Sequence, residues 1–157
     1  MKNILVLSVA MAAMLMGPAF AAESPRVSQP PASAPAAKTD LSLTFKVHQF
    51  QRGALMIAIF DSEAAYMGDG QAVRLLKLDV TSDTVPVVLP DLAPGRYGVK
   101  LFHDLNGTGK LVTNMFGIPT EPVAFSNNAK INMRAPNWAE ASFDLPPSGA
   151  AQTIDID

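Results

Sequence analysis

From Asp40 onward, apolar and polar residues alternate along the chain, and this period of two constrains the fold more than any other feature. In LSLTFKVH, residues 41–48, the apolar residues at odd positions share one face and the polar residues share the other. Such alternation is typical of a half-buried β-strand. The next segment, ALMIAIF at residues 54–60, is apolar on both faces, which predicts a central strand.

Five further segments show strand patterns, and residues 61–70 predict one short helix that begins at Asp61 or Ser62 and ends at glycines. A shift of parity between Leu75 and Leu76 predicts a bulge or a twist. Pro86 lacks an amide hydrogen, which predicts a strand at a sheet edge. The segments are residues 73–80, 84–89, 97–104, 139–145 and 152–157.

About seven strands, spaced roughly ten residues apart and without a long helix, predict an all-β fold, an antiparallel β-sandwich. Residues 105–137 show little periodicity and are rich in Gly, Pro and Asn, which predicts one long irregular loop. The sandwich domain is expected to span residues 40–157. The chain has no Cys, so this domain must fold without disulfides.

The first 39 residues show two patterns that are not those of a folded domain. Lys2, the apolar run at 4–16 and the sequence Ala19-Phe20-Ala21 predict a signal peptide over residues 1–21, with an uncleaved membrane anchor as the alternative. Residues 22–39 are rich in Pro, Ala and Ser, which predicts a disordered linker. We therefore expect an exported protein, periplasmic or secreted, with no transmembrane span after cleavage.

Composition and motifs exclude several classes of function. The chain has 12 Lys and Arg against 14 Asp and Glu, without a basic cluster, so nucleic acid is not an expected partner. The absence of Cys excludes thiolate metal sites and a Cys nucleophile. The sequence contains no GxSxG, GxGxxG, GxxxxGK or HExxH motif. We therefore expect a protein that is not an enzyme and has no cofactor, with calcium as the one candidate ion.

The calcium candidate rests on HDLNGTGKLVTN, residues 103–114. If Asp104 is position 1 of a calcium loop, Asn106 and Thr108 fall at positions 3 and 5, and a glycine falls at position 6. The second half lacks ligands, because Val112 and Met115 occupy positions 9 and 12. The alternative is a Gly-rich turn in which Asp104 and Asn106 bond their own backbone.

A second group of polar residues crowds into the irregular region. A functional interpretation is a polar binding surface at one end of the sandwich. A structural interpretation is that these side chains satisfy the hydrogen bonds of buried loop backbone. The residues are Asn114, Glu121, Ser126, Asn127 and Asn128.

Three other side chains have two interpretations each. His103 continues the inward parity of its strand, so it is either a structural imidazole bonded to a loop carbonyl or a catalytic base near Asp104 and Glu121. His48 lies on the polar face of its strand and is expected to be solvated. Trp138, the only Trp, either seats the irregular loop against the sheets or stacks on a sugar ring.

The run GRYGVKLFHDLNGTGKLVTNMFGIPTEPVAFSNNA, residues 95–129, resembles a bacterial family of exported proteins, domain of unknown function 2141. The resemblance extends from about Leu41 to Ile156 and is most specific in GIP, EP and FSNN, residues 117–128. It implies an immunoglobulin-like or prealbumin-like sandwich and no established activity. The chain departs from the family pattern where Thr108 replaces Asn and Val112 replaces Asp, and where residues 122 and 124 replace glycines.

Three hypotheses of function follow. The preferred one is a non-enzymatic binding module that uses residues 105–137 to hold an unknown cell-envelope protein or a small polar ligand. The first alternative is a structural module stabilised by calcium at Asp104, Asn106 and Thr108. The second is a hydrolase whose site involves His103, Asp104 and Glu121.

Overall fold

The computed structural model describes residues 38–49 and 52–157. The predicted signal peptide lies outside these residues, and so does the predicted linker up to residue 37. Strand β1 begins at Thr39, so the folded domain starts one residue before the predicted boundary. Within the described residues, no helix combines the length and the apolar character needed to cross a bilayer.

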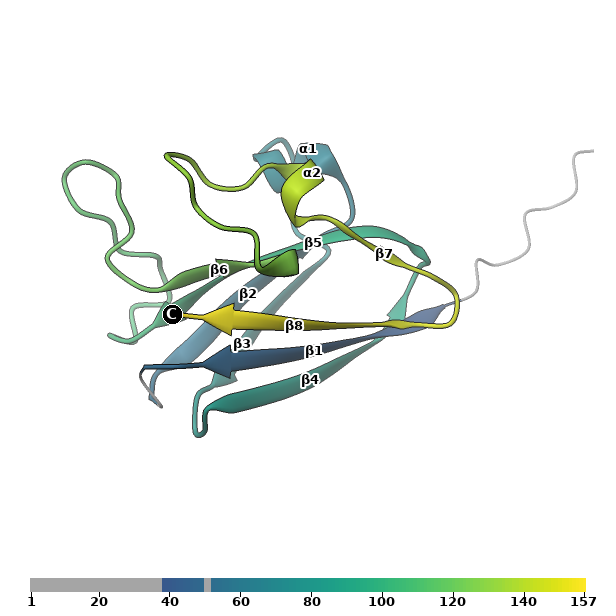
Figure 1. Cartoon of the computed structure of the whole chain (residues 1–157), viewed down its shortest axis with the longest axis horizontal. Coiled ribbons are helices and arrows are strands. Elements are labelled where there is room, and N and C mark those ends of the chain that lie inside the picture. The colour runs from purple at the N-terminus through teal and green to yellow at the C-terminus, as the bar shows by residue number, and fades with distance from the viewer. Residues whose placement is uncertain (1–37, 50–51) are drawn as a thin grey trace, which may run out of the picture. The chain divides into compact units, whose positions relative to one another are not determined.

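The described residues form eight strands and three short helical segments (Figure 1). In chain order these are β1 (Thr39–Val47), β2 (Ala54–Phe60), α1 (Glu63–Met67), β3 (Arg74–Asp79), β4 (Thr84–Leu92), β5 (Gly95–Asp104), β6 (Val123–Phe125), η1 (Ser126–Asn128), α2 (Trp138–Ala141), β7 (Phe143–Leu145) and β8 (Ala150–Ile156).

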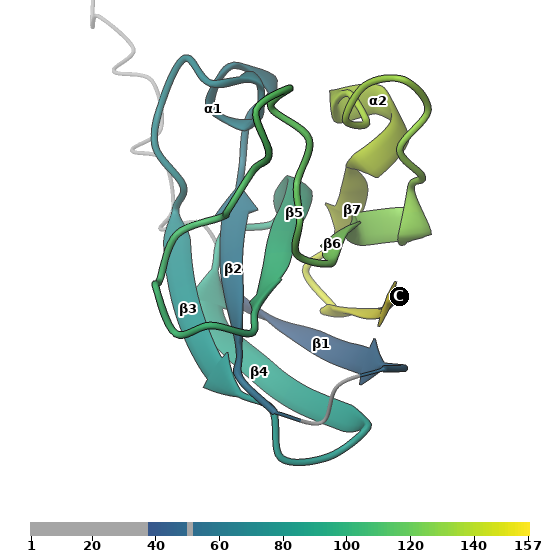
Figure 2. The ribbon, with the colours of Figure 1, turned by 90° about the vertical axis from the view of Figure 1, so that its left-hand side faces the viewer.

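The strands form two sheets, and this confirms the predicted β-sandwich. One sheet has the order β4-β1-β8, and the other has the order β3-β2-β5-β6, with β7 also paired to β5. Figure 2 shows β2, β3 and β5 as one layer and β1 and β4 as the other. Pro86 lies in β4 at the edge of the smaller sheet, as predicted. All pairs are antiparallel except β1–β8, which is parallel.

The predicted alternation defines the core between the sheets. Phe45 and Val99 are fully buried, and Leu43 and Leu101 are 1% and 3% exposed. Ile154 and Ile156 of β8 close the core from the smaller sheet. Burial of such side chains stabilises the fold by about 1.5–3 kcal/mol each.

Two predictions of local structure differ in part from the structure. Of the bulge or twist predicted at Leu75–Leu76, the bulge is absent, because the register of β3 with β2 is continuous from Arg74 to Asp79. The parity shift instead arises because Leu75 points outward and is 77% exposed. Residues 139–141, predicted as the start of a strand, instead belong to helix α2 (Trp138–Ala141), because the Asn137 side chain and Glu140 form a capping box at its start. The predicted helix at 61–70 is present as α1, which ends at Gly68.

Candidate binding groove and the loops that frame it

Asp104 organises the loop that leaves β5. Its carboxylate, 1% exposed, accepts hydrogen bonds from the backbone amides of Gly107 (2.8 Å), Thr108 (3.1 Å) and Gly109 (2.7 Å). Burial raises the pKa of Asp104, but amides of the loop, Gly109 first, lower it more, so the pKa lies below its ordinary value. Asn106 Oδ1 also accepts from the Thr108 amide, at 3.0 Å. The carboxylate therefore acts as the centre of a closed turn.

The oxygen atoms proposed for calcium are thus engaged by the loop itself. The Thr108 hydroxyl donates to the carbonyl oxygen of Lys110 at 3.0 Å. No group of three or more His, Cys, Asp or Glu residues that could hold a metal ion occurs within the described ranges. The geometry favours the interpretation of this segment as a Gly-rich turn, and calcium binding stays a hypothesis for titration.

Glu121 fastens both ends of the same loop. Its carboxylate is 7% exposed and accepts from the amides of Leu105 and Val112, each at 3.2 Å. His103 Nε2 donates to the Arg52 carbonyl oxygen at 2.6 Å, which is the structural role considered for this imidazole. In the part of the chain that the structure describes, no hydrogen bond joins His103, Asp104 and Glu121. Each of the three side chains binds backbone instead.

Asn114 shapes the tip of the excursion from β5 to β6. Its Oδ1 accepts from the amides of Phe116 (2.9 Å) and Ile118 (3.1 Å). A bridge between Thr113 and Pro119 pairs the two arms of this turn. The turn leaves Phe116 79% exposed and Ile118 57% exposed. The polar side chain thus holds a tip whose surface is apolar.

Ser126, Asn127 and Asn128 lie apart from that excursion and join three elements. The Ser126 hydroxyl, fully buried, accepts from the Val99 amide at 2.8 Å and donates to the Ala141 carbonyl oxygen at 2.5 Å. Asn127 Nδ2 donates to the Ser142 carbonyl oxygen at 2.9 Å. Asn128 exchanges two hydrogen bonds with Asp155 of β8, one through each end of its amide.

The predicted polar residues therefore form two separate groups. Asp104, Asn106, Thr108, Asn114 and Glu121 organise residues 104–121, whereas residues 126–128 bind β5, β8 and the segment around α2. All of them direct polar atoms to the protein's own backbone or, for Asn128, also to a neighbouring carboxylate. This supports the structural interpretation of these side chains, and their role as ligand contacts stays a proposal.

A third feature, which sequence reasoning missed, lies on the outer face of the larger sheet. The register across four strands aligns two rows of side chains that point away from the core. The first row is Leu75–Ala58–Lys100–Phe125, and the second is Lys77–Met56–Phe102–Val123. Six of these eight residues are apolar, although an outward face of an antiparallel sheet is usually polar. The sequence feature that could have indicated this face is the segment of β2, which is apolar on both faces. That pattern predicted only a central strand.

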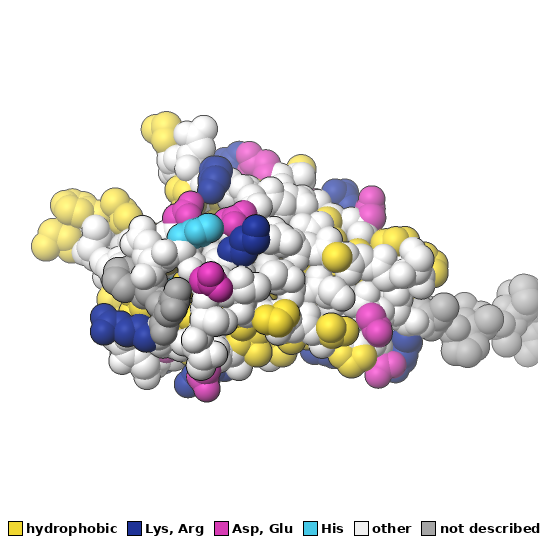
Figure 3. All heavy atoms as spheres, turned by 60° about the horizontal axis from the view of Figure 1, so that its bottom comes forward, with side chains coloured by type: hydrophobic (Ala, Val, Ile, Leu, Met, Phe, Trp, Pro, Cys, Tyr) yellow, Lys and Arg dark blue, Asp and Glu magenta, His cyan; other side chains and the backbone are white. Residues whose placement is uncertain are grey.

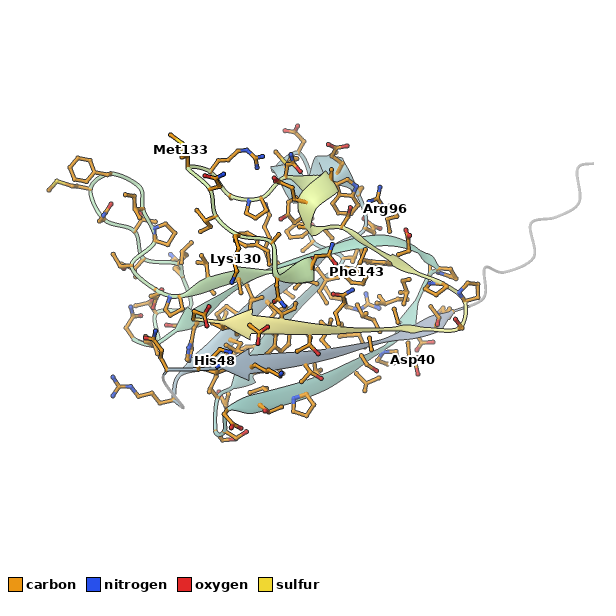
Figure 4. The ribbon with its side chains drawn as sticks, in the orientation of Figure 1. Asp40, His48, Arg96, Lys130, Met133 and Phe143 are labelled. Carbon is orange, nitrogen blue, oxygen red and sulfur yellow. The ribbon has the colours of Figure 1, made fainter. Side chains whose placement is uncertain are left out.

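Two loops, residues 105–122 (the first loop) and 129–137 (the second loop), extend away from the sheets (Figure 1). Their side chains and this face line a groove of about 1070 Å³. Leu111, Phe116 and Ile118 of the first loop line it, and Ile131 and Met133 line it from the second. Several of these side chains extend away from the domain; Met133 is fully exposed and points outward in Figure 4. In Figure 3, the far end of the first loop stands out as hydrophobic spheres.

All charged residues that line the groove are basic. They are Lys77, Lys100 and Arg134, and the described residues that line it include no Asp or Glu. Lys100 Nζ donates to the Tyr66 carbonyl oxygen at 2.5 Å and lies 4.0 Å from the Tyr66 ring centroid. Burial lowers the pKa of this ammonium. Arg134 forms a bidentate pair with Glu140, at 2.7 and 3.1 Å.

An aromatic cluster anchors the second loop where it returns to the domain. Trp138 is 8% exposed and meets the Tyr66 ring edge-on at 5.6 Å. The Tyr66 hydroxyl donates to the Pro136 carbonyl oxygen at 3.2 Å, and burial, with a smaller contribution from Glu140, raises its pKa to about 12. Trp138 therefore seats the loop against the sheet, as expected, and its buried ring is not placed to stack on a sugar.

Comparison with known proteins places the chain in a family. The sequence model of a bacterial family described as "Uncharacterized protein conserved in bacteria (DUF2141)" matches residues 44–154, which is most of the described domain. No curated protein and no solved structure matches the chain. The immunoglobulin-like or prealbumin-like detail of the sandwich therefore stays a prediction. The chain belongs to the DUF2141 family.

Proposed function

We propose that the protein is an exported, non-enzymatic binding module that holds the apolar part of a ligand or partner in the groove on its larger sheet. The observation that supports this proposal is the apolar outer face of β3-β2-β5-β6, with exposed apolar side chains on both flanking loops. Contiguous exposed apolar surface of this kind marks interaction sites. The groove volume lies just above the range for small-molecule sites, about 300–1,000 Å³.

The rigidity of the floor supports this proposal. The floor residues lie on paired strands, so their positions are fixed by the sheet. The first loop is held by Asp104, Glu121 and Asn114, and the second is anchored by Trp138. A largely pre-formed site lowers the entropic cost of binding. The lining favours a ligand with an apolar part over the small polar ligand expected from the sequence.

Nile red, an uncharged dye that fluoresces in apolar surroundings, tests the proposal. Ala58 lies at the centre of the groove floor and is half-buried, so Ala58→Trp fills the floor without entering the core. Thr44→Trp is the matched control, because Thr44 is half-buried on the outer face of β1, the central strand of the other sheet. We expect dye binding in the wild type and in T44W, and its loss in A58W. Equal binding by both variants, or none by the wild type, would refute the proposal.

A further inference from the structure

We infer that the ligand of this groove is a single-chain amphiphile with an anionic headgroup, such as a long-chain alkyl carboxylate taken up as a monomer. This inference rests on the proposed function and adds the chemistry of the ligand. It follows from one row of the floor, Lys77–Met56–Phe102–Val123, which has a cation at one end and apolar side chains along the rest.

Lys77 is the cation available to a ligand. Lys100 is engaged by the Tyr66 carbonyl oxygen and ring, and Arg134 is engaged by Glu140. Lys77 is exposed, and among the described residues no hydrogen bond or ion pair involves its ammonium. Because the charged lining residues described are all basic, the groove attracts an anion and disfavours a cation.

The length of the row fits one extended acyl chain. Neighbouring strands lie about 4.8 Å apart, so the four strands of the row span ~14 Å. This is close to the length of an extended dodecyl chain. A headgroup at Lys77 on the β3 edge would place the chain over Met56 and Phe102 and its end near Val123 of β6.

The loops on either side favour a monomer over a membrane surface. The floor residues Met56, Phe102 and Val123 are half-buried between loops whose Phe116 and Met133 are strongly exposed. A bilayer is too broad to reach a floor that is flanked in this way, whereas a single chain can lie along it. The inference therefore commits to the free amphiphile.

Competition against bound Nile red tests the headgroup. Dodecanoate, dodecyl maltoside and dodecyltrimethylammonium share one chain and differ in charge, and each is used below its micelle concentration. We expect dodecanoate to displace the dye at about tenfold lower concentration than the ammonium compound, with the maltoside between them. Equal displacement by all three would overturn the anionic headgroup and leave the groove function standing. Displacement by none, with the dye still bound, would overturn the acyl ligand, and absence of dye binding would overturn the proposed function as well.

Two variants and one vesicle assay complete the test. Lys77→Met is expected to weaken dodecanoate about threefold, as for an exposed ion pair, while leaving dodecyl maltoside unchanged. Lys46→Met, the same change on the outer face of β1, is the control and is expected to change neither. An equal effect of both variants would refute the role of Lys77. Co-sedimentation with phosphatidylglycerol vesicles without displacement by monomeric dodecanoate would identify a membrane surface instead and overturn the inference.

Discussion

Ser126→Ala should destabilise the domain strongly although it removes a single atom from a polar side chain. β7 pairs with Gly95–Tyr97 of β5, and β6 pairs with Lys100–Phe102 on the same edge. Val99 lies in the gap between these two pairings, and the Ser126 hydroxyl takes the place of the missing strand by accepting from its amide at 2.8 Å. The same hydroxyl donates to the Ala141 carbonyl oxygen.

The magnitude follows from the two groups that the substitution leaves behind. Val99 and Ala141 are both fully buried, so their amide hydrogen and carbonyl oxygen lose a partner where water does not reach. An unsatisfied buried polar group costs about 1–3 kcal/mol. Because the two are coupled through one hydroxyl, we expect a total loss of ~2–3 kcal/mol. For a domain of this size that corresponds to a fall in Tm of about 8–12 °C.

Chemical denaturation monitored by Trp138 fluorescence measures this loss, and Ser82→Ala provides the control. The Ser82 hydroxyl donates to the Thr84 carbonyl oxygen at an exposed site, so the same substitution there should cost below about 0.5 kcal/mol. If Ser126→Ala loses no more stability than the Ser82→Ala control, the gap in the β5 edge is filled by other groups. That result would refute the role assigned to the Ser126 hydroxyl.

Three further predictions concern the same domain. Gly98→Ala should cost about 1–3 kcal/mol in denaturation, because a Cβ there would lie 2.9 Å from the Trp138 ring and 3.0 Å from Tyr66; an unchanged midpoint would contradict the packing described. Asp104→Asn should destabilise the domain at neutral pH. The difference in stability between the variant and the wild type should shrink as pH falls through the depressed pKa of Asp104, since a carboxylate with a lowered folded pKa stabilises only while ionised. A stability difference that stays constant with pH in acid would argue against this role of Asp104. Millimolar calcium should leave Tm unchanged relative to chelator, whereas a bound ion at 100 times its Kd would add ~2.7 kcal/mol.

The sandwich could be predicted from sequence because the alternation of side chains is a local property. The inward positions of Leu43, Phe45, Val99 and Leu101 follow from period two alone, and all four are buried. The edge position of β4 followed from one residue, Pro86. Helix α2 was missed because its residues also alternate, and the capping pair Asn137–Glu140 decided the structure locally.

The groove could not be predicted in the same way because it depends on register between strands. Apolar residues on both faces of β2 are compatible with a strand covered on both sides, and the sequence does not show that the outer face of this sheet is covered only in part, around Phe60 and Phe125. The alignment of Met56 with Lys77 and Phe102 arises from pairings between segments far apart in the chain. The role of Ser126 was hidden for the same reason, since its partners lie 27 and 15 residues away.

The contrast between the two outer faces is the strongest argument that the groove has a function. In β1 the outward residues are Ser42, Thr44 and Lys46, whereas in β2 they are Met56, Ala58 and Phe60, of which Phe60 packs against Tyr66. Both are central strands with equally buried inner faces, so the core between the sheets does not explain the apolar Met56 and Ala58. Apolar side chains left at the surface contribute little to folding, because hydrophobic stabilisation scales with the area removed from water. Met56 and Ala58 are half-buried and Phe116 is 79% exposed, so their remaining exposed area gains that stabilisation only when another molecule covers it.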